Sequence, residues 1–302
     1  MKLAFDLICR LAFWLLLAPL VPGIINKVKA WVAGRRGPPV LQLYYDLGRL
    51  WRKGVVLSTV VSPGFVAGPA VAWVALAGAA LLLPVGSLWP AEVFRGDAIL
   101  FVGLLALARF ATAGAALDTG SAFEGMGAAR EVSYAVLAEA AIIAALLTLS
   151  LQSRSVALAE MLATPVGAGA VLLAGGLFTV LLAENCRVPF DDPSTHLELT
   201  MIHEVMVLDH SGPPLAAILH GGSLKLLMFS VLLAEAVLPI GKLSPLAAAG
   251  ALAAAVLALA VAVGLVESLL ARLAFRRVPL LLTTGFLLCL FAMLATWRGG
   301  GR

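Results

Sequence analysis

Ionisable side chains gather in one short stretch of this chain, from Ala183 to Gly212. The stretch reads AENCRVPFDDPSTHLELTMIHEVMVLDHSG and holds six of the 17 carboxylates and three of the four histidines. Long apolar segments border it on both sides. Because ionised side chains are costly beside a bilayer, this concentration indicates a function rather than packing alone.

Proton transfer is the chemistry that this set of side chains suits. Burial raises the pKa of a carboxylate and lowers that of a lysine, and histidine already titrates near neutral pH. We therefore predict a hydrated proton relay, and the alternative is a solvated loop that caps the bundle. The candidate relay residues are Glu139, Glu184, Glu198, Glu204, Asp209, His196, His203, Lys225 and Glu235.

Other site chemistries lack their motifs. His203 and Glu204 begin an HExxH pattern, but Val207 stands where its second histidine is needed. Ser211 lacks the G-x-S-x-G pattern of hydrolases. No catalytic, cofactor or metal site is therefore predicted in this chain, and its widely spaced cysteines form no metal-binding motif: Cys9, Cys186 and Cys289.

The composition is that of an integral membrane protein. Of the 302 residues, 62% are hydrophobic and only 13% charged, with a mean hydropathy of +1.03, whereas soluble domains carry about a quarter charged residues. A net charge of +4 could indicate nucleic-acid binding, but the basic residues lie in short segments between apolar spans, which indicates membrane orientation instead. We expect an all-α polytopic fold, one transmembrane domain over residues 1–302, and no nucleic-acid partner.

Each membrane span needs roughly 20 apolar residues, and the sequence predicts eight. An even number puts both termini on one side. The connections after the odd-numbered spans carry twelve Lys and Arg residues, against three in the others. These connections, with main loops at about 26–63 and 184–214, are therefore predicted to be cytoplasmic, in an inner (plasma) membrane. The predicted spans are 3–25, 64–84, 97–117, 132–151, 165–183, 215–238, 246–267 and 278–297.

The first cytoplasmic connection is predicted to contain an amphipathic helix in the membrane interface. After the breakers Gly37 to Pro39, the residues Leu43, Leu47 and Leu50 recur near helical spacing. Such a helix binds lipid headgroups or offers a docking surface to a soluble partner, and both readings stay open. The candidate docking residues are Arg35, Arg36, Tyr44, Tyr45, Asp46 and Arg49.

Several charged residues fall inside predicted spans and should face the bundle interior, because exposure to lipid costs about 2.5 to 3.5 kcal/mol each. For Glu139 and Lys225 we favour a function over a structural ion pair. For Arg109 and Glu267 both readings stay open, and Asp6 with Arg10 is predicted to be a structural pair.

Two local expectations concern the polar stretch. Glu184 and Arg187 would pair if the helix of the fifth span continued through them. Residues 194–208 lack Gly and Pro and can form a helix that places His196, Thr200 and His203 on one edge.

The glycine-rich segment 118–139 lacks a phosphate-binding motif, and its expected role is close backbone approach to a neighbour.

The polar stretch resembles the membrane subunit shared by complex I and the group 4 membrane-bound [NiFe]-hydrogenases, including formate hydrogenlyase. The hydrogenase branch has the pattern ENxRxPxDxPxTHLELTMIHEAMxLEYSG, which this chain follows closely except at Asp209 and His210. The segments GRRGPPVLQLYYDL and GMGAAREVSYAVLAE also match. The resemblance implies a subunit that couples redox chemistry to ion translocation through these residues: Glu139, Glu184, Arg187, Asp191, Glu198, Glu204 and Asp209.

The resemblance also implies a function for the whole chain. We expect a noncatalytic membrane-anchor and coupling subunit of a formate hydrogenlyase-like complex. Its partners would be the hydrogenase large and small subunits, an Fe–S subunit, an antiporter-like membrane subunit and the lipid bilayer. The Fe–S clusters and Ni–Fe centre would belong to those partners. The alternatives are a subunit lining the quinone site of an NADH:quinone oxidoreductase, a stand-alone secondary transporter and a purely structural anchor.

Overall fold

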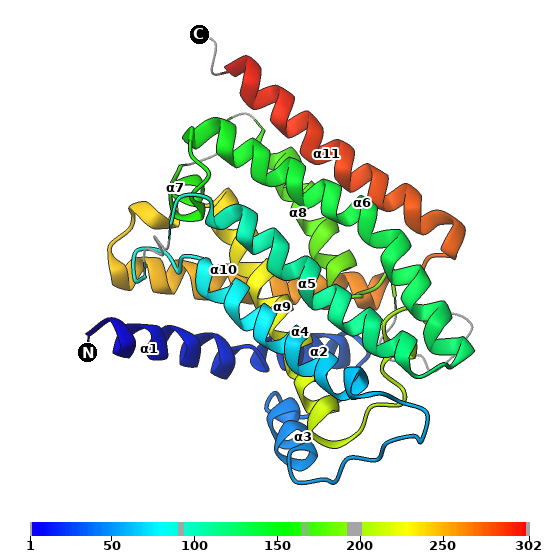
Figure 1. Cartoon of the computed structure of the whole chain (residues 1–302). Coiled ribbons are helices and arrows are strands. Elements are labelled where there is room, and N and C mark those ends of the chain that lie inside the picture. Colours follow the sequence, from blue (N-terminus) through cyan, green and yellow to red (C-terminus); the bar gives the residue numbers. More distant parts are fainter. Residues whose placement is uncertain (1, 90–93, 165–166, 168, 192–200, 300–302) are drawn as a thin grey trace.

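The computed structural model describes residues 2–89, 94–164, 167, 169–191 and 201–299, and over these residues it is helical, with no β-strand longer than an isolated bridge. Seven helical segments in this part are long and apolar enough to cross a membrane, which confirms the all-α polytopic class. Figure 1 shows α9 in the middle of the bundle, and 67% of its apolar window is buried. The helices of the seven segments are α1 (Lys2–Leu17) with α2 (Leu20–Val32), α4 (Pro63–Leu82), α5 (Asp97–Asp118), α6 (Ala122–Ser153), α9 (Gly212–Val237), α10 (Pro245–Leu269) and α11 (Val278–Gly299).

Three shorter α-helices complete the described part: α3 (Gln42–Leu50), α7 (Leu158–Ala163) and α8 (Ala170–Glu184). The helix α8 lies where a full span was predicted, but its 15 residues rise only about 22 Å, less than the roughly 30 Å of a hydrocarbon core. It packs against α6, α9 and α11. The described structure therefore has seven full-length spans and one short apolar helix in place of eight equal ones.

The first span is longer than predicted and is broken in the middle. The helix α1 ends at Leu17, and α2 begins at Leu20 after Pro19. Proline removes a backbone donor and disfavours helical geometry in the preceding residue, which accounts for the break. Because α2 continues to Val32, Lys27 and Lys29 belong to the helix rather than to the connection after it.

The helix α6 also begins earlier than predicted. It starts at Ala122, so most of the segment expected to be a glycine-rich loop is helical. The expected close approach is confirmed at Gly127, where an added Cβ would lie 2.3 Å from Val205 Cγ1 and 3.0 Å from the Ile202 carbonyl oxygen. Helix α6 is therefore held by contacts with the distant residues 202–206.

We predict that Gly127→Ala will loosen the segment 201–211, because the new methyl group overlaps the buried Val205 side chain. Gly125→Ala is the matched control in the same helix, since its Cβ would meet only Leu117 Cδ2 at 3.9 Å. Alanine should stabilise the helix there by about 0.5 to 1 kcal/mol. Limited proteolysis of the segment should be faster in the first variant only, and equal rates in both would contradict the packing argument.

The connections after the odd-numbered spans meet at one end of the bundle, as predicted. The Val56 N–H donates to Ser211 Oγ at 2.9 Å, and the Ser62 N–H to Asp118 Oδ2 at 2.7 Å. The Leu273 N–H donates to the Pro189 carbonyl at 2.9 Å. These bonds join all four connections into one polar end of the molecule.

Candidate functional site

The candidate site is a cluster of five charged side chains from four helices. Glu184 Oε1 lies 2.5 Å from Arg109 Nη2, and its Oε2 lies 2.6 Å from Lys225 Nζ. Arg109 also pairs with Glu139 through Nη1, and its Nε lies 3.7 Å from Glu131. Arg109 comes from α5, Glu131 and Glu139 from α6, Glu184 from α8 and Lys225 from α9. We call these five residues the central cluster.

The charges of the central cluster do not balance. Three carboxylates face two cations, so the fully ionised cluster carries one excess negative charge. The Glu184 side chain is 1% exposed and the Arg109 side chain 9%. Charges interact strongly where water is largely excluded. The cluster can therefore take up one proton without becoming positive overall.

Two cavities reach the central cluster. The larger, of about 370 Å³, is lined by Arg109, Glu131, Glu184 and Lys225, together with residues of the polar stretch. The smaller, of about 30 Å³, touches Arg109, Glu131 and Glu184. A water needs roughly 10 to 15 Å³ of such space. Both cavities are therefore large enough for ordered water to contact the ion pairs.

The polar stretch is anchored by Asp191. Its Oδ1 lies 3.1 Å from Arg272 Nη2, and its Oδ2 accepts from the N–H groups of Ile202 and His203 at 3.0 and 3.1 Å. Arg130 donates to the Met201 carbonyl at 2.9 Å. These contacts bring residue 191 and residues 201–203 together as one folded unit.

The helix predicted over residues 194–208 is wrong for its described part. From Met201 to Leu208 only a single 3₁₀ turn forms, at Glu204–Met206. The physical reason is that Asp191 takes the N–H groups that an α-helix would bond internally. The candidates His196 and Glu198 lie outside the described residues.

The predicted pair between Glu184 and Arg187 does not form. Helix α8 ends at Glu184, and Cys186 turns the chain with a left-handed φ of 50°. Arg187 Nη1 instead lies 3.2 Å from Glu267 Oε1, whose other oxygen lies 2.8 Å from Lys29 Nζ. The Glu267 side chain is fully buried. Its ion pairs with Lys29 and Arg187 connect α10 to α2 and to the start of the polar stretch.

The other candidates lie in different surroundings. His203 and Glu204 line the larger cavity, beside the central cluster. Asp209 is exposed, and its N–H donates to Glu124 Oε1 at 3.1 Å. Glu235 is buried near the C-terminal end of α9, about 15 Å along the helix from Lys225, where it accepts from the Gly86 N–H. Asp209 and Glu235 thus lie outside the central cluster.

One ion pair and one stacked ring pair outside the central cluster have a structural role. The Asp6 and Arg10 pair is confirmed, with 2.9 Å between Oδ2 and Nε. The imidazole of His210 is buried and stacks on Phe65 with 4.0 Å between ring centroids. Burial lowers the pKa of His210 to about 4, although nearby Asp209 opposes the shift. His210 is therefore neutral at pH 7 and contributes packing.

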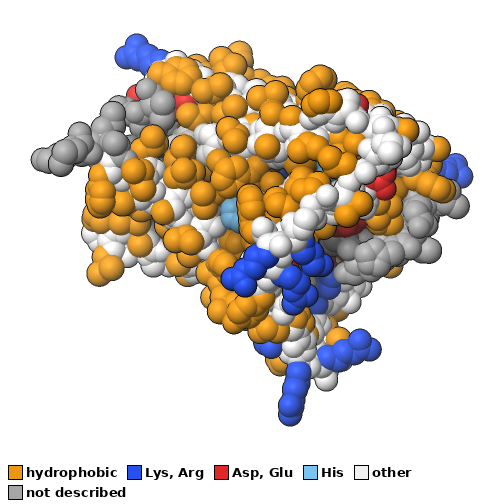
Figure 2. Space-filling model, turned by 60° about the horizontal axis from the view of Figure 1, so that its bottom comes forward, with side chains coloured by type: hydrophobic (Ala, Val, Ile, Leu, Met, Phe, Trp, Pro, Cys, Tyr) orange, Lys and Arg blue, Asp and Glu red, His pale blue; other side chains and the backbone are white. Residues whose placement is uncertain are grey.

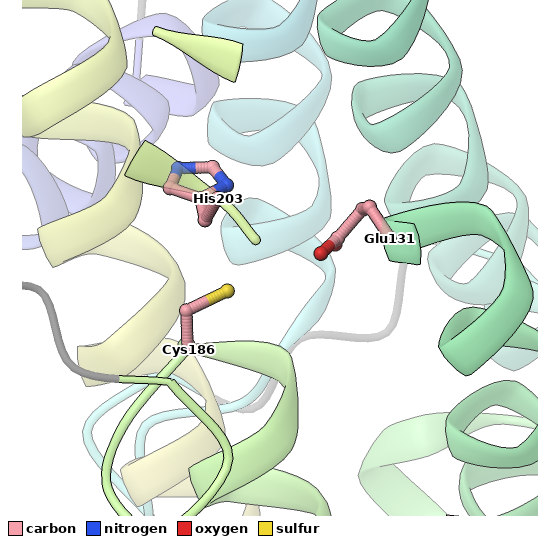
Figure 3. Close-up of side chains that lie close together, drawn as sticks. All are labelled: Glu131, Cys186 and His203. Carbon is pink, nitrogen blue, oxygen red and sulfur yellow. The ribbon is translucent and has the colours of Figure 1, made fainter. Parts of the chain in front are cut away.

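Sequence reasoning missed Glu131 and left Arg109 undecided. Glu131 was overlooked because the segment before it was read as a loop, which hid its place on the same helix as Glu139. The structure also shows that Glu131, Cys186 and His203 form a group of described residues that could hold a metal ion, which no spacing in the sequence predicted (Figure 3).

The amphipathic helix after the first span is confirmed as α3, with Leu47 buried. Of the docking candidates, Arg35, Arg36, Tyr45 and Arg49 are exposed. The Tyr44 hydroxyl donates to the Leu16 carbonyl, and Asp46 accepts from Gln42 at 3.1 Å. Figure 2 shows basic side chains gathered at the α3 end and hydrophobic ones over much of the remaining face. The exposed basic set is available for a partner or for lipid headgroups.

Comparison with known proteins gives consistent matches. A model of the family described as NADH dehydrogenase matches residues 5–297. Hydrogenase-4 component C of Escherichia coli (strain K12) is 32% identical over 243 residues, which are 78% of this chain and 75% of that protein. Formate hydrogenlyase subunit 4 of the same organism is 29% identical over 282 residues, covering 89% of this chain and 91% of that protein.

A solved structure shares the fold. One chain of an archaeal respiratory membrane complex, the membrane-bound sulfane sulfur reductase, superposes with a TM-score of 0.82. The match covers 98% of this chain and all of that one, at 20% identity. The helical arrangement described above is therefore that of a known membrane-complex subunit.

Proposed function

The chain belongs to the NADH dehydrogenase family and is a membrane subunit of a hydrogenase- or complex I-like assembly, and within that assembly we propose that it couples redox chemistry to ion translocation. The proposal takes the complex to be a formate hydrogenlyase-like [NiFe]-hydrogenase. This chain anchors the soluble subunits and carries part of the ion path.

The observation that carries the proposal is the central cluster beside the larger cavity. Arg109 joins three carboxylates, and Glu184 joins Arg109 to Lys225, so a proton bound at one member changes the charge felt by all the others. His203 and Glu204 of the polar stretch line the same cavity. A charge change at a docked redox centre can therefore reach the cluster through the polar stretch.

The partners follow from the same proposal. The hydrogenase large and small subunits and an Fe–S subunit would dock at the polar end, near Arg35, Arg36 and Arg49, and an antiporter-like subunit would pack within the bilayer. The Fe–S clusters and the Ni–Fe centre belong to these partners. The polar end faces the cytoplasm, since it carries most of the basic residues between spans, and the membrane is the cell's inner membrane.

The experiment is to replace Glu139 and Glu204 with Gln separately. Each variant should assemble but lose redox-driven ion uptake, because Gln cannot gain or lose a proton. Glu160→Gln, an exposed carboxylate in α7, is the matched control. Native gels would check assembly, and uptake by proteoliposomes would be followed with a pH-sensitive dye. Unchanged uptake in both variants would refute the proposal.

A second candidate function is quinone binding, which the larger cavity favours. Its volume of about 370 Å³ falls within the roughly 300 to 1,000 Å³ of small-molecule sites. Its wall combines apolar residues such as Trp73 and Leu76 with the central cluster. A photoreactive quinone should then label this wall in the purified complex, and labelling only elsewhere would exclude the quinone function.

A further inference from the structure

Three potential metal ligands lie together at the edge of the larger cavity. Carboxylate, thiol and imidazole ligand atoms of Glu131, Cys186 and His203 all lie within 4.8 Å of one another. Figure 3 shows the three side chains converging from separate segments of the chain. They come from α6, from the turn after α8 and from the residue before the 3₁₀ turn. The fold therefore brings together three ligand residues that are far apart in the sequence.

The donor set selects a particular class of cation. Thiolate and imidazole ligands favour Zn²⁺ and its thiophilic relatives, whereas Mg²⁺ and Ca²⁺ prefer oxygen. Zinc bonds of about 2.0 to 2.3 Å place tetrahedral ligands roughly 3.5 Å apart. Side-chain rotations that move the ligand atoms by about an ångström would bring the three atoms to that geometry. Three protein ligands leave a fourth position for water.

Two of the ligands are positioned by the backbone. The His203 N–H donates to Asp191 at 3.1 Å, and the Cys186 N–H donates to the Ala183 carbonyl at 3.1 Å. Cys186 adopts a φ of 50°, which few residues other than Gly, Asn and Asp adopt. That conformation turns the chain at the end of α8, next to Glu184 of the central cluster.

A cation can reach the group through water. All three side chains are half-buried and line the cavity of about 370 Å³. Burial raises the pKa of the Cys186 thiol well above its usual range, so the thiol is protonated. On binding, the metal displaces this proton, which leaves to the cavity water while the sulfur forms the metal bond.

We propose that Glu131, Cys186 and His203 bind one Zn²⁺ ion from the cavity. Binding of the ion requires only these three residues. Inhibition of ion uptake by the bound ion is a further consequence, which rests on the proposed function. Glu131 also faces Arg109, at 3.7 Å from its Nε. A bound dication would draw Glu131 away from Arg109 and cancel the excess negative charge of the central cluster, so proton uptake there should fail.

The test uses the purified complex after chelator treatment, titrated with Cd²⁺ as the probe. Bound cadmium would be measured by mass spectrometry and the metal–thiolate bond by its ultraviolet charge-transfer band. The wild type should bind one ion more than Cys186→Ser and His203→Gln, or bind it at least about tenfold more tightly. Cys9→Ser removes another half-buried free thiol and should match the wild type. Two independent ligand variants keep the test valid if one fails to assemble.

Equal binding and an equal charge-transfer band in the wild type and both ligand variants would overturn the site. Inhibition is measured separately, as the effect of Zn²⁺ on redox-driven ion uptake by the wild type and by Cys186→Ser, because Cys186 has no role in the proposed ion path. Cadmium bound through Cys186 without any inhibition by Zn²⁺ would keep the site and overturn the role given to the central cluster. The two failures are thereby distinguished.

Discussion

Replacing Arg109 with Gln should lower redox-driven ion uptake of the assembled complex at least about tenfold, the factor that a change of about 1.4 kcal/mol produces. Arg109 is the only described residue within ion-pair distance of Glu131, Glu139 and Glu184 together. Without it the fully ionised central cluster would carry two excess negative charges. Repulsion among the carboxylates then favours their protonated forms, so the cluster releases a proton less readily.

The free-energy cost of removing Arg109 depends on how deeply each of its carboxylate partners is buried. Removing one partner of a buried ion pair costs about 3 to 5 kcal/mol, and this range applies to Glu184, whose side chain is 1% exposed. Glu139 is 36% exposed, so solvent screens its share. Arg276→Gln is the control, since Arg276 is exposed. Arg109→Lys should restore only part of the uptake, because lysine cannot bond three carboxylates in a planar fork. Full uptake by the Gln variant would remove Arg109 from the mechanism.

The sequence was sufficient to place the apolar helices but not their breaks and extensions. Apolar runs of span length are visible in the residues themselves. The helical start of α6 is different, because the sequence around it is glycine-rich and residues 202–206, distant in sequence, pack against Gly127 there. Likewise, residues 201–208 contain no helix breaker, yet Asp191 removes two of the N–H groups that a helix needs. Both errors come from contacts between residues distant in sequence.

The same limit applies to the candidate site. The cost of a charge inside a span identified Glu139 and Lys225 as residues of interest. It could not identify their partners, because the partners depend on how each helix is rotated and which helices are neighbours. Glu184 and Arg187, three apart, pair with different helices instead of each other, since α8 ends between them. Within the central cluster, Glu139 and Lys225 were therefore predictable as residues of interest, whereas Glu131 and the pairing of the charges were not.

A double-mutant cycle on Glu184 and Lys225 should separate stability from coupling. Glu184→Gln alone leaves the Lys225 ammonium, 17% exposed, without its carboxylate partner 2.6 Å away. The complex should lose thermal stability, since an uncompensated buried charge costs about 3 to 5 kcal/mol. In the double variant with Lys225→Met both charges are gone, and replacing a buried pair by neutral groups is often nearly neutral. Stability should therefore recover, while Arg109 keeps Glu139 and Glu131 as partners.

If the pair carries protons, ion uptake should not recover with stability in the double variant. A purely structural pair would give uptake that recovers with stability in the double variant. A pair that carries protons gives uptake that stays at least about tenfold below wild type in all three variants, because neither Gln nor Met exchanges a proton. Thermal unfolding of the detergent-purified complex and uptake by proteoliposomes provide the two readouts, and their interaction energies can be compared directly. Recovery of both together would reduce Glu184 and Lys225 to an anchor between α8 and α9.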